Sequence, residues 1–239
     1  PSDTSYAEGM YDTYDIDGYD NIQYHTPAGL LPYGISFKVV YAPSGQATAA
    51  NDYTAAGSVN AQTSTTDTTA DGGITAAAAG ASVSHYQVKM AEIPMLDGLT
   101  IGADYFEVSG GNGAKEQKPE SGAYYATYAA GPAVIGYSKN FTAFPVNVTS
   151  ADTLESIENT KYSVSINVND NLSISYENEK SNPQTARNAT QYEMTSTGIQ
   201  AAYTMGGMTL GVAMNDHENA TYTQNKDVKD TVFTVEMAF

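Results

Sequence analysis

The sequence predicts an all-β protein, a transmembrane barrel whose antiparallel strands run up and down. Three observations indicate this fold: side-chain character alternates along many short stretches, tight turns alternate with long polar segments, and the stretch 229–239 is apolar on one side. In that stretch Phe233, Val235 and Phe239 share one parity, so an extended strand places them on one face. The alternative is an edge strand of a soluble sandwich, with the same face packed on a core.

Composition agrees with membrane-spanning strands. The 239 residues are 41% hydrophobic, with a mean hydropathy of −0.35. The chain holds no run of about 18 apolar residues, the length that a transmembrane helix needs. Only every second residue of a barrel strand faces lipid, so a barrel also scores as polar. The 19 Tyr residues suit membrane interfaces, where the ring is buried and the hydroxyl stays wet.

Charge and motif content exclude several functions. The net charge is −17, from 27 acidic and 10 basic residues, which disfavours nucleic acid as a partner because phosphate contacts need clustered Lys and Arg. The absence of Cys excludes disulfides and thiolate metal sites. His25, His85 and His217 are scattered, and no sequence motif of a hydrolase or a phosphate-binding loop occurs. We therefore expect no enzyme activity.

The first third of the chain alternates strand candidates with polar stretches. Residues 1–20 are acidic, rich in Tyr and Gly, and without an apolar face, so they predict a loop with at most one helical turn. Strands are predicted over 21–27, 33–41 and 83–92. Residues 42–81 are rich in Ala, Thr, Gly and Ser, and predict a long exposed loop.

From residue 97 onward, short turns and long polar segments alternate. The turns carry the Gly, Asn, Asp or Pro residues that tight hairpins prefer. They are Asp97-Gly98, Gly131-Pro132, Asn169-Asp170 and Gly206-Gly207. The long polar segments are 109–121, 142–159, 178–190 and 216–228. This rhythm is typical of outer-membrane barrels, with short turns at one end and long loops at the other.

The strand count points to a part of a larger barrel. Ten strands are predicted from Tyr33 to Phe239, or eleven with Asn21–Pro27, all within one domain over 1–239. A closed bacterial barrel has an even number of strands. We therefore expect eleven strands to leave the wall open.

Three stretches resemble the general diffusion porins of alphaproteobacteria, a sixteen-stranded family. They are Asn21–Pro27 (NIQYHTP), Thr197–Val212, and the closing strand that ends on Phe239. The resemblance implies that Asn21–Pro27 is the sixth strand and that residues 1–20 belong to a constriction loop. It also implies an outer-membrane homotrimer in contact with lipid and lipopolysaccharide, through which small hydrophilic solutes and ions diffuse passively.

The resemblance also suggests pore residues. An acidic rim at the constriction would comprise Glu8, Asp12, Asp15, Asp17 and Asp20, which favour cations; a solvated loop is the alternative. Asp12, Asp15 and Asp17 are spaced like calcium ligands, but an EF-hand needs a Glu where Tyr24 stands. No cofactor is expected, and a looser calcium site is left open.

The remaining candidates lie on the predicted strands. Polar faces assign a pore wall to Lys38, His85, Lys89, Asp104, Glu177 and Glu236. The family usually sets an arginine cluster opposite its acidic loop, whereas this chain has a single Arg, Arg187. Membrane-interface aromatics are expected at Tyr33, Tyr41, Tyr105, Tyr124, Tyr137, Tyr162, Tyr176, Tyr203 and Phe239.

The function expected is a passive, cation-favouring channel of the bacterial outer membrane. The alternative is a structural or adhesive envelope protein, either a non-conducting barrel or a secreted β-sandwich. The two differ in the side of the sheet on which the Tyr and aliphatic side chains lie. Outward-facing side chains indicate a membrane barrel, and inward-facing ones a soluble core.

Overall fold

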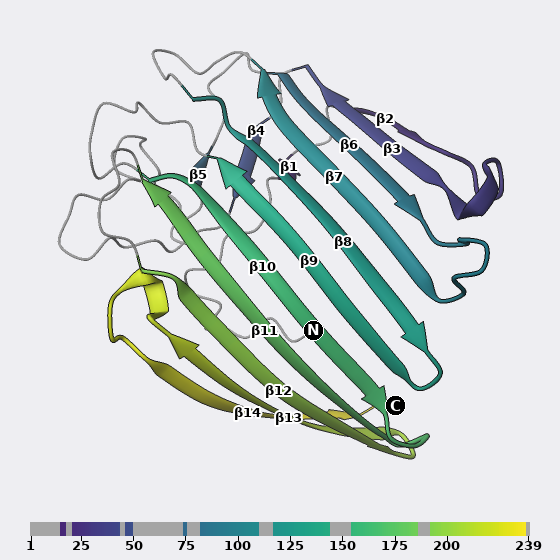
Figure 1. Cartoon of the computed structure of the whole chain (residues 1–239), viewed down its shortest axis with the longest axis vertical. Helices are drawn as coiled ribbons and strands as arrows, with labels where there is room; N and C mark the ends of the chain where they lie inside the picture. Colours follow the sequence, from purple (N-terminus) through teal and green to yellow (C-terminus); the bar gives the residue numbers. More distant parts are fainter. Residues whose placement is uncertain are drawn as a thin grey trace.

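The described residues of this computed structural model form two antiparallel sheets (Figure 1). They are residues 15–17, 21–43, 46–49, 74–75, 82–109, 117–143, 154–185 and 192–237. No α-helix occurs among them, and the two 3-10 turns are η1 (Pro32–Gly34) and η4 (Ala220–Tyr222). None of the helical turns described is long and apolar enough to cross a membrane.

The large sheet has eleven strands, each hydrogen-bonded to its neighbours in chain order. The strands are β2 (Ile22–His25), β3 (Ser36–Ala42), β6 (Ser82–Met90), β7 (Leu99–Ser109), β8 (Glu120–Ala130), β9 (Ala133–Ala143), β10 (Leu154–Asn167), β11 (Leu172–Thr185), β12 (Met194–Met205), β13 (Met208–Glu218) and β14 (Val228–Met237). All eleven strands predicted from the alternating pattern are present. The antiparallel up-and-down topology is therefore confirmed.

The small sheet lies in segments predicted as loops. It joins β1 (Asp15–Asp17), β4 (Gln46–Ala49) and β5 (Ile74–Thr75), in the order β1-β4-β5. Asp15 pairs with Thr48 and Asp17 with Gln46. Residues 1–20 and 42–81 thus contain short strands, which the small and acidic residues of these segments do not predict.

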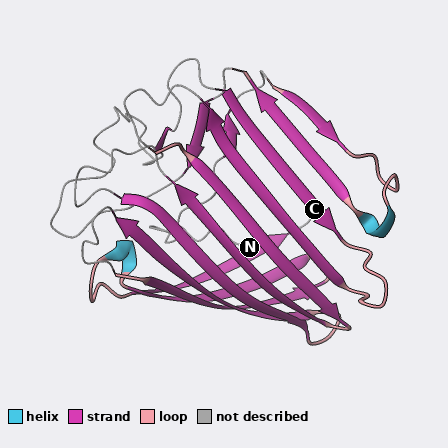
Figure 2. Ribbon diagram, turned by 45° about the horizontal axis from the view of Figure 1, so that its top comes forward, coloured by secondary structure: helices cyan, strands magenta, loops and turns pink. Residues whose placement is uncertain are grey.

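The large sheet is strongly curved. In Figure 1 strands β12 to β14 bend behind the others, and Figure 2 shows the same curl from another side. The sheet begins at β2 and ends at β14, and the described part of the chain shows no pairing between these two edges. Because every neighbouring pair is antiparallel, the eleventh strand runs in the same direction as the first. The edges β2 and β14 therefore run in the same direction.

Three of the predicted turns close tight hairpins. Gly131, between β8 and β9, has φ +58°, and Gly206, between β12 and β13, has φ +62°; both values favour glycine. Between β10 and β11, Asn169 Oδ1 accepts hydrogen bonds from the backbone N–H groups of Asn171 and Leu172. The Asp97-Gly98 turn instead ends a longer connection, residues 91–98.

The strand boundaries differ from the predicted ones in two ways. Tyr33 was predicted inside a strand, but it lies in η1 with φ +58°, and the strand begins only at Ser36. The predicted polar segments 142–159 and 178–190 overlap β10 and β11, which extend to Leu154 and Thr185. Polar residues there occupy both faces, so the alternation that marks a strand disappears although the pairing continues.

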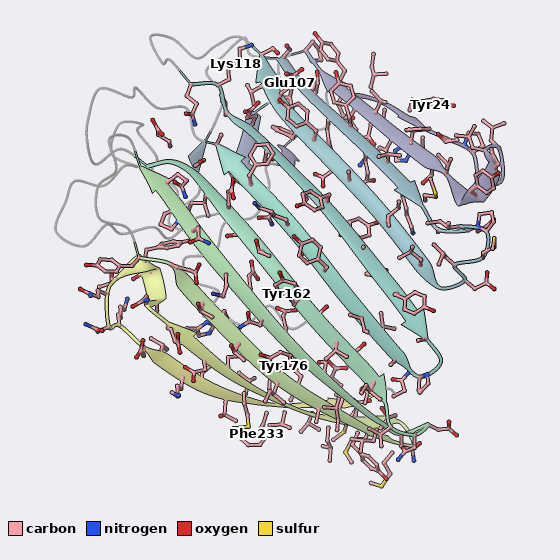
Figure 3. All side chains as sticks on the ribbon, viewed as in Figure 1. Tyr24, Glu107, Lys118, Tyr162, Tyr176 and Phe233 are labelled. Atoms are coloured by element: carbon pink, nitrogen blue, oxygen red, sulfur yellow. The ribbon has the colours of Figure 1, made fainter. Side chains whose placement is uncertain are left out.

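The two faces of the sheet differ in chemistry. Figure 3 shows Tyr162 and Tyr176 on the convex side, toward the viewer, and we name this side the outer face. Apolar and aromatic residues of one parity are exposed on it along nearly every strand. They include Ile22, Tyr24, Phe37, Val39, Tyr41, Tyr86, Val88, Ile101, Tyr105, Tyr124, Tyr128, Ile135, Tyr162, Ile166, Ile174, Tyr176, Ile199, Tyr203, Leu210, Met214, Phe233, Val235 and Met237.

The inner face is partly covered and partly open. Val83, Phe106, Ile157 and Met194 are fully buried on it, near the end of the sheet that carries the long connections. Toward the short turns of β10–β14 lies a groove of about 350 Å³. Ser165, Ser173, Ser175, Gln200 and Thr234 supply polar groups to this groove.

Candidate functional site

Two lysines and an aspartate lie on the inner face of the first strands. Lys38 on β3 pairs with Gln87 on β6, and Gln87 pairs with Asp104 on β7, so the three share one row across the sheet. Lys89 lies two residues from Gln87, opposite Ser36. These positions agree with the polar face predicted for Lys38, Lys89 and Asp104.

His85 does not simply extend a basic strip. Its Nε2 lies 3.7 Å from Asp104 Oδ2, and its ring is 6.0 Å from that of Phe106. The side chain is largely buried, and Nε2 has no hydrogen-bond partner among the described residues. His85 thus faces an acid on the neighbouring strand, a relation that only the cross-strand register reveals.

An ion-pair cluster occupies the middle of the inner face. Lys161 Nζ on β10 lies 3.0 Å from Glu177 Oε1 and 3.4 Å from Glu179 Oε2, both on β11. Lys161 pairs with Glu179 in the ladder, which places all three on one face. Glu177 was predicted as a wall residue. Lys161 and Glu179 were not, because Lys161 comes just after the predicted polar segment 142–159 and Glu179 lies within the predicted polar segment 178–190.

A second cluster, which is largely buried, joins the last three strands. Ser196 Oγ on β12 lies 2.8 Å from His217 Nδ1 on β13. His217 Nε2 lies 3.6 Å from Asp230 Oδ1 on β14, and Asn215 Nδ2 donates to Asp230 Oδ2 at 3.0 Å. His217 is 3% exposed. No sequence motif indicates this cluster, because Ser196, His217 and Asp230 are 13 to 34 positions apart along the chain.

This cluster contains the residue types of a serine hydrolase without its working geometry. Ser196 contacts Nδ1, and the separation of Nε2 from Asp230 exceeds a hydrogen bond. The buried ring also gives a substrate little access. The arrangement therefore suits a structural or proton-binding role better than acyl transfer.

Residues 219–227, which connect β13 to β14, fold over the inner face; we name them the cap segment. Tyr222 Oη lies 2.6 Å from Ser181 Oγ on β11, so the segment reaches across β12. Asn219 Nδ2 donates to the backbone oxygen of Glu193 at 3.0 Å, and Lys226 Nζ donates to Thr221 Oγ1 at 3.0 Å. Ala220, Thr221 and Tyr222 are buried.

The cap segment is also conformationally strained. Asn219, Thr221, Tyr222 and Asn225 have φ between +52° and +58°, a region that residues other than glycine rarely adopt. The sequence predicts only a polar segment over 216–228. An inward fold could not be predicted, because it depends on contacts with β11 and β12.

The predicted acidic rim is only partly described. Glu8, Asp12 and Asp20 lie outside the described residues, and Asp15 and Asp17 are placed only as members of β1. The part of the chain that the structure describes contains no cluster of three His, Asp or Glu residues able to hold a metal. The possible calcium site over residues 12–17 therefore stays a prediction.

The predicted interface aromatics lie mainly on the outer face. Tyr41, Tyr105, Tyr124, Tyr162, Tyr176 and Tyr203 are exposed there. Tyr137 is half-buried between Tyr124 and Tyr162, with ring centroids 6.2 and 5.2 Å away. Tyr33 is exposed in η1, and Phe239 lies outside the described residues.

Charged pairs border the outer face at the end with the long connections. Lys139 Nζ lies 2.8 Å from Glu158 Oε2, and Lys180 Nζ lies 2.9 Å from Glu193 Oε1. The hydrogen bond from Lys180 lowers the pKa of Glu193, which stands before β12 begins. A further pair joins Lys229 to Asp216. Apolar exposure therefore gives way to charge along each of these strands.

Carboxylates outnumber amino groups on the described inner face. The acids are Asp104, Glu177, Glu179, Asp230 and Glu236, which pairs with Thr209 on β13. The bases are Lys38, Lys89 and Lys161. Lys161 is already paired with its two glutamates, so among the described residues of this face the lysines without a printed ion pair are Lys38 on β3 and Lys89 on β6.

These features define an antiparallel up-and-down β-sheet protein with an apolar outer face and a polar inner face. Comparisons with protein-family models, curated proteins and solved structures find no match to this chain.

Proposed function

We propose that the large sheet is part of the wall of a β-barrel in the bacterial outer membrane, with its inner face lining a water-filled channel. The observation that carries this proposal is the exposure of aromatic and aliphatic side chains across the whole outer face. Soluble monomers rarely expose a contiguous apolar area above a few hundred Å². Barrel strands in lipid carry such a face, and their polar residues alternate toward the lumen.

The charged pairs on the outer face support a boundary at which the lipid-facing apolar band ends. Lys139–Glu158, Lys180–Glu193 and Lys229–Asp216 stand at the end of the sheet opposite the short turns. Charges of this kind are costly in hydrocarbon but not at its border. In the proposed orientation, this end and the long connections face the outside of the cell, and the short turns face the periplasm.

The parity of the strands supports a larger barrel. The edges β2 and β14 run in the same direction, so joining them directly would create a parallel pair. An all-antiparallel barrel needs an odd number of strands besides these eleven. A second copy in the same membrane orientation supplies eleven strands, but brings β2 and β14 together in parallel again. A sixteen-stranded barrel needs five more, which fits the resemblance to diffusion porins.

The solutes proposed are small and hydrophilic, with cations favoured. The inner face carries more carboxylates than amino groups, and its groove is lined mainly by hydroxyl, amide and small groups. Rings of carboxylates attract cations, while an uncharged polar wall lets water and solutes pass without tight binding. By resemblance, the proposal extends to a homotrimer in contact with lipid and lipopolysaccharide.

The test is single-channel conductance of the full-length protein in a planar bilayer, with the reversal potential measured across a salt gradient. Steady conductance steps and a cation-selective reversal potential are expected. Protein that inserts with its β-structure intact but conducts no ions would contradict the channel, and would favour a structural or adhesive barrel instead.

A further inference from the structure

The root of the cap segment carries two unsatisfied polar atoms that face one another. His217 pairs with Val228 in the last register pair before the segment, and Asp230 stands two residues further along β14. His217 Nε2 and Asp230 Oδ1 are buried, 3.6 Å apart, and both are without a hydrogen-bond partner in the described structure. A buried polar atom without a partner costs free energy, so this pair needs an explanation.

A hydrogen on Nε2 gives both atoms a partner, and full protonation of the ring adds a positive charge beside the carboxylate. In the imidazolium form both ring nitrogens donate, Nδ1–H to Ser196 Oγ and Nε2–H toward Asp230 Oδ1. The charge on the ring then attracts the carboxylate, which a shift of a few tenths of an ångström brings within hydrogen-bond distance. Asn215 already holds the other oxygen, Asp230 Oδ2, so the carboxylate is oriented in advance.

The other charged groups described around His217 are engaged. Glu179, in the same row of the sheet as Ser196 and His217, lies 3.4 Å from Lys161 Nζ. Within the cap segment, Lys226 donates to Thr221 Oγ1, and Asp227 accepts from the backbone N–H of Asn219. Asp230 is thus the charged group that the geometry pairs with His217.

We propose that Ser196, His217 and Asp230 form a proton-dependent latch, which fixes the cap segment against the inner face when His217 is protonated. The backbone of the cap segment is strained, and left-handed residues persist only where surrounding contacts hold them. The segment therefore needs contacts at its root to keep its conformation. The contact between His217 and Asp230 joins β13 to β14 next to their last register pair, where the cap segment begins and ends. The proposal does not depend on ion conduction.

Amide hydrogen exchange of the full-length protein in detergent micelles tests the latch. The reporters are the backbone N–H of Ala220, which donates to Lys226 O at 2.7 Å, and that of Asn225, which donates to Asn219 Oδ1 at 3.0 Å. After correction for intrinsic exchange, their protection should rise about tenfold when the pH is lowered from about pH 8 to about pH 5, a range that spans the ordinary charge change of histidine side chains.

Variants show which residues cause this rise in protection. His217→Gln and Asp230→Asn should each abolish it, while His85→Gln should keep it, because His85 faces Asp104 in a similar pair far from the cap segment. Circular dichroism would establish that each variant keeps its β-structure. A flat profile in the wild type, or a wild-type rise in either His217→Gln or Asp230→Asn, would overturn the proposal.

A second measurement needs no variant. The imidazole carbon resonances of His217 should titrate with the same midpoint as the protection of Ala220. Different midpoints would show that another group controls the segment and would likewise overturn the latch.

Discussion

Tyr222 Oη lies 2.6 Å from Ser181 Oγ, and this buried contact ties the connection after β13 to the inner face of β11. The contact crosses the intervening strand β12, so it fixes the cap segment over the wall. Its position on the inner face means that the segment would narrow a channel lined by this face.

Tyr222→Phe should loosen the cap segment. The substitution keeps the buried ring and removes the hydrogen bond to Ser181, which is worth about 1 kcal/mol. Amide exchange at Ala220 should then accelerate about fivefold, as that free energy implies. In a double-mutant cycle with Ser181→Ala, the coupling energy should be about 1 kcal/mol; a coupling near zero would contradict the anchoring role.

Lys161→Met should increase cation selectivity. Removing the amino group leaves Glu177 and Glu179 without their shared counter-ion on the inner face, so the wall becomes more negative. The reversal potential across a salt gradient should shift further toward the cation value. Lys180→Met is the matched control, because Lys180 pairs with Glu193 on the outer face, and it should leave the reversal potential nearly unchanged.

Ile174→Lys and Ser175→Lys test the two faces on one strand. Ile174 is exposed on the outer face, and its neighbour Ser175 lines the inner groove. A lysine in this lipid-facing position, between the short turn and the middle of the strand, should lower the free energy of unfolding in bilayers by about 1–3 kcal/mol. Ser175→Lys should cost far less, since its charge meets water. Equal effects in denaturant titrations would contradict a lipid-facing outer side.

Much of the wall could be predicted from the alternation of side chains. Phe233, Val235 and Met237 follow one parity and lie exposed on one face, as the pattern of the terminal stretch indicates. The short turns at Gly131 and Gly206 were also predicted, because their residues favour the left-handed backbone that hairpins use.

The clusters could not be predicted, since the pairing register decides them. Ser196, His217 and Asp230 meet only through two cross-strand alignments, and the sequence contains no motif for either. The strand ends near Leu154 and Thr185 were missed for another reason: where both faces are polar, the two-residue period carries no contrast. The inward fold of the cap segment depends on its contacts with β11 and β12.

The most direct test of the account is the water accessibility of β11 in lipid vesicles. The protein has no native cysteine, so single cysteines at positions 173 to 177 can be labelled with a membrane-impermeant maleimide. Ser173→Cys, Ser175→Cys and Glu177→Cys should react, whereas Ile174→Cys and Tyr176→Cys should be protected by lipid. This alternation is the predicted result. Uniform reactivity at all five positions would contradict a membrane wall with a water-lined inner face.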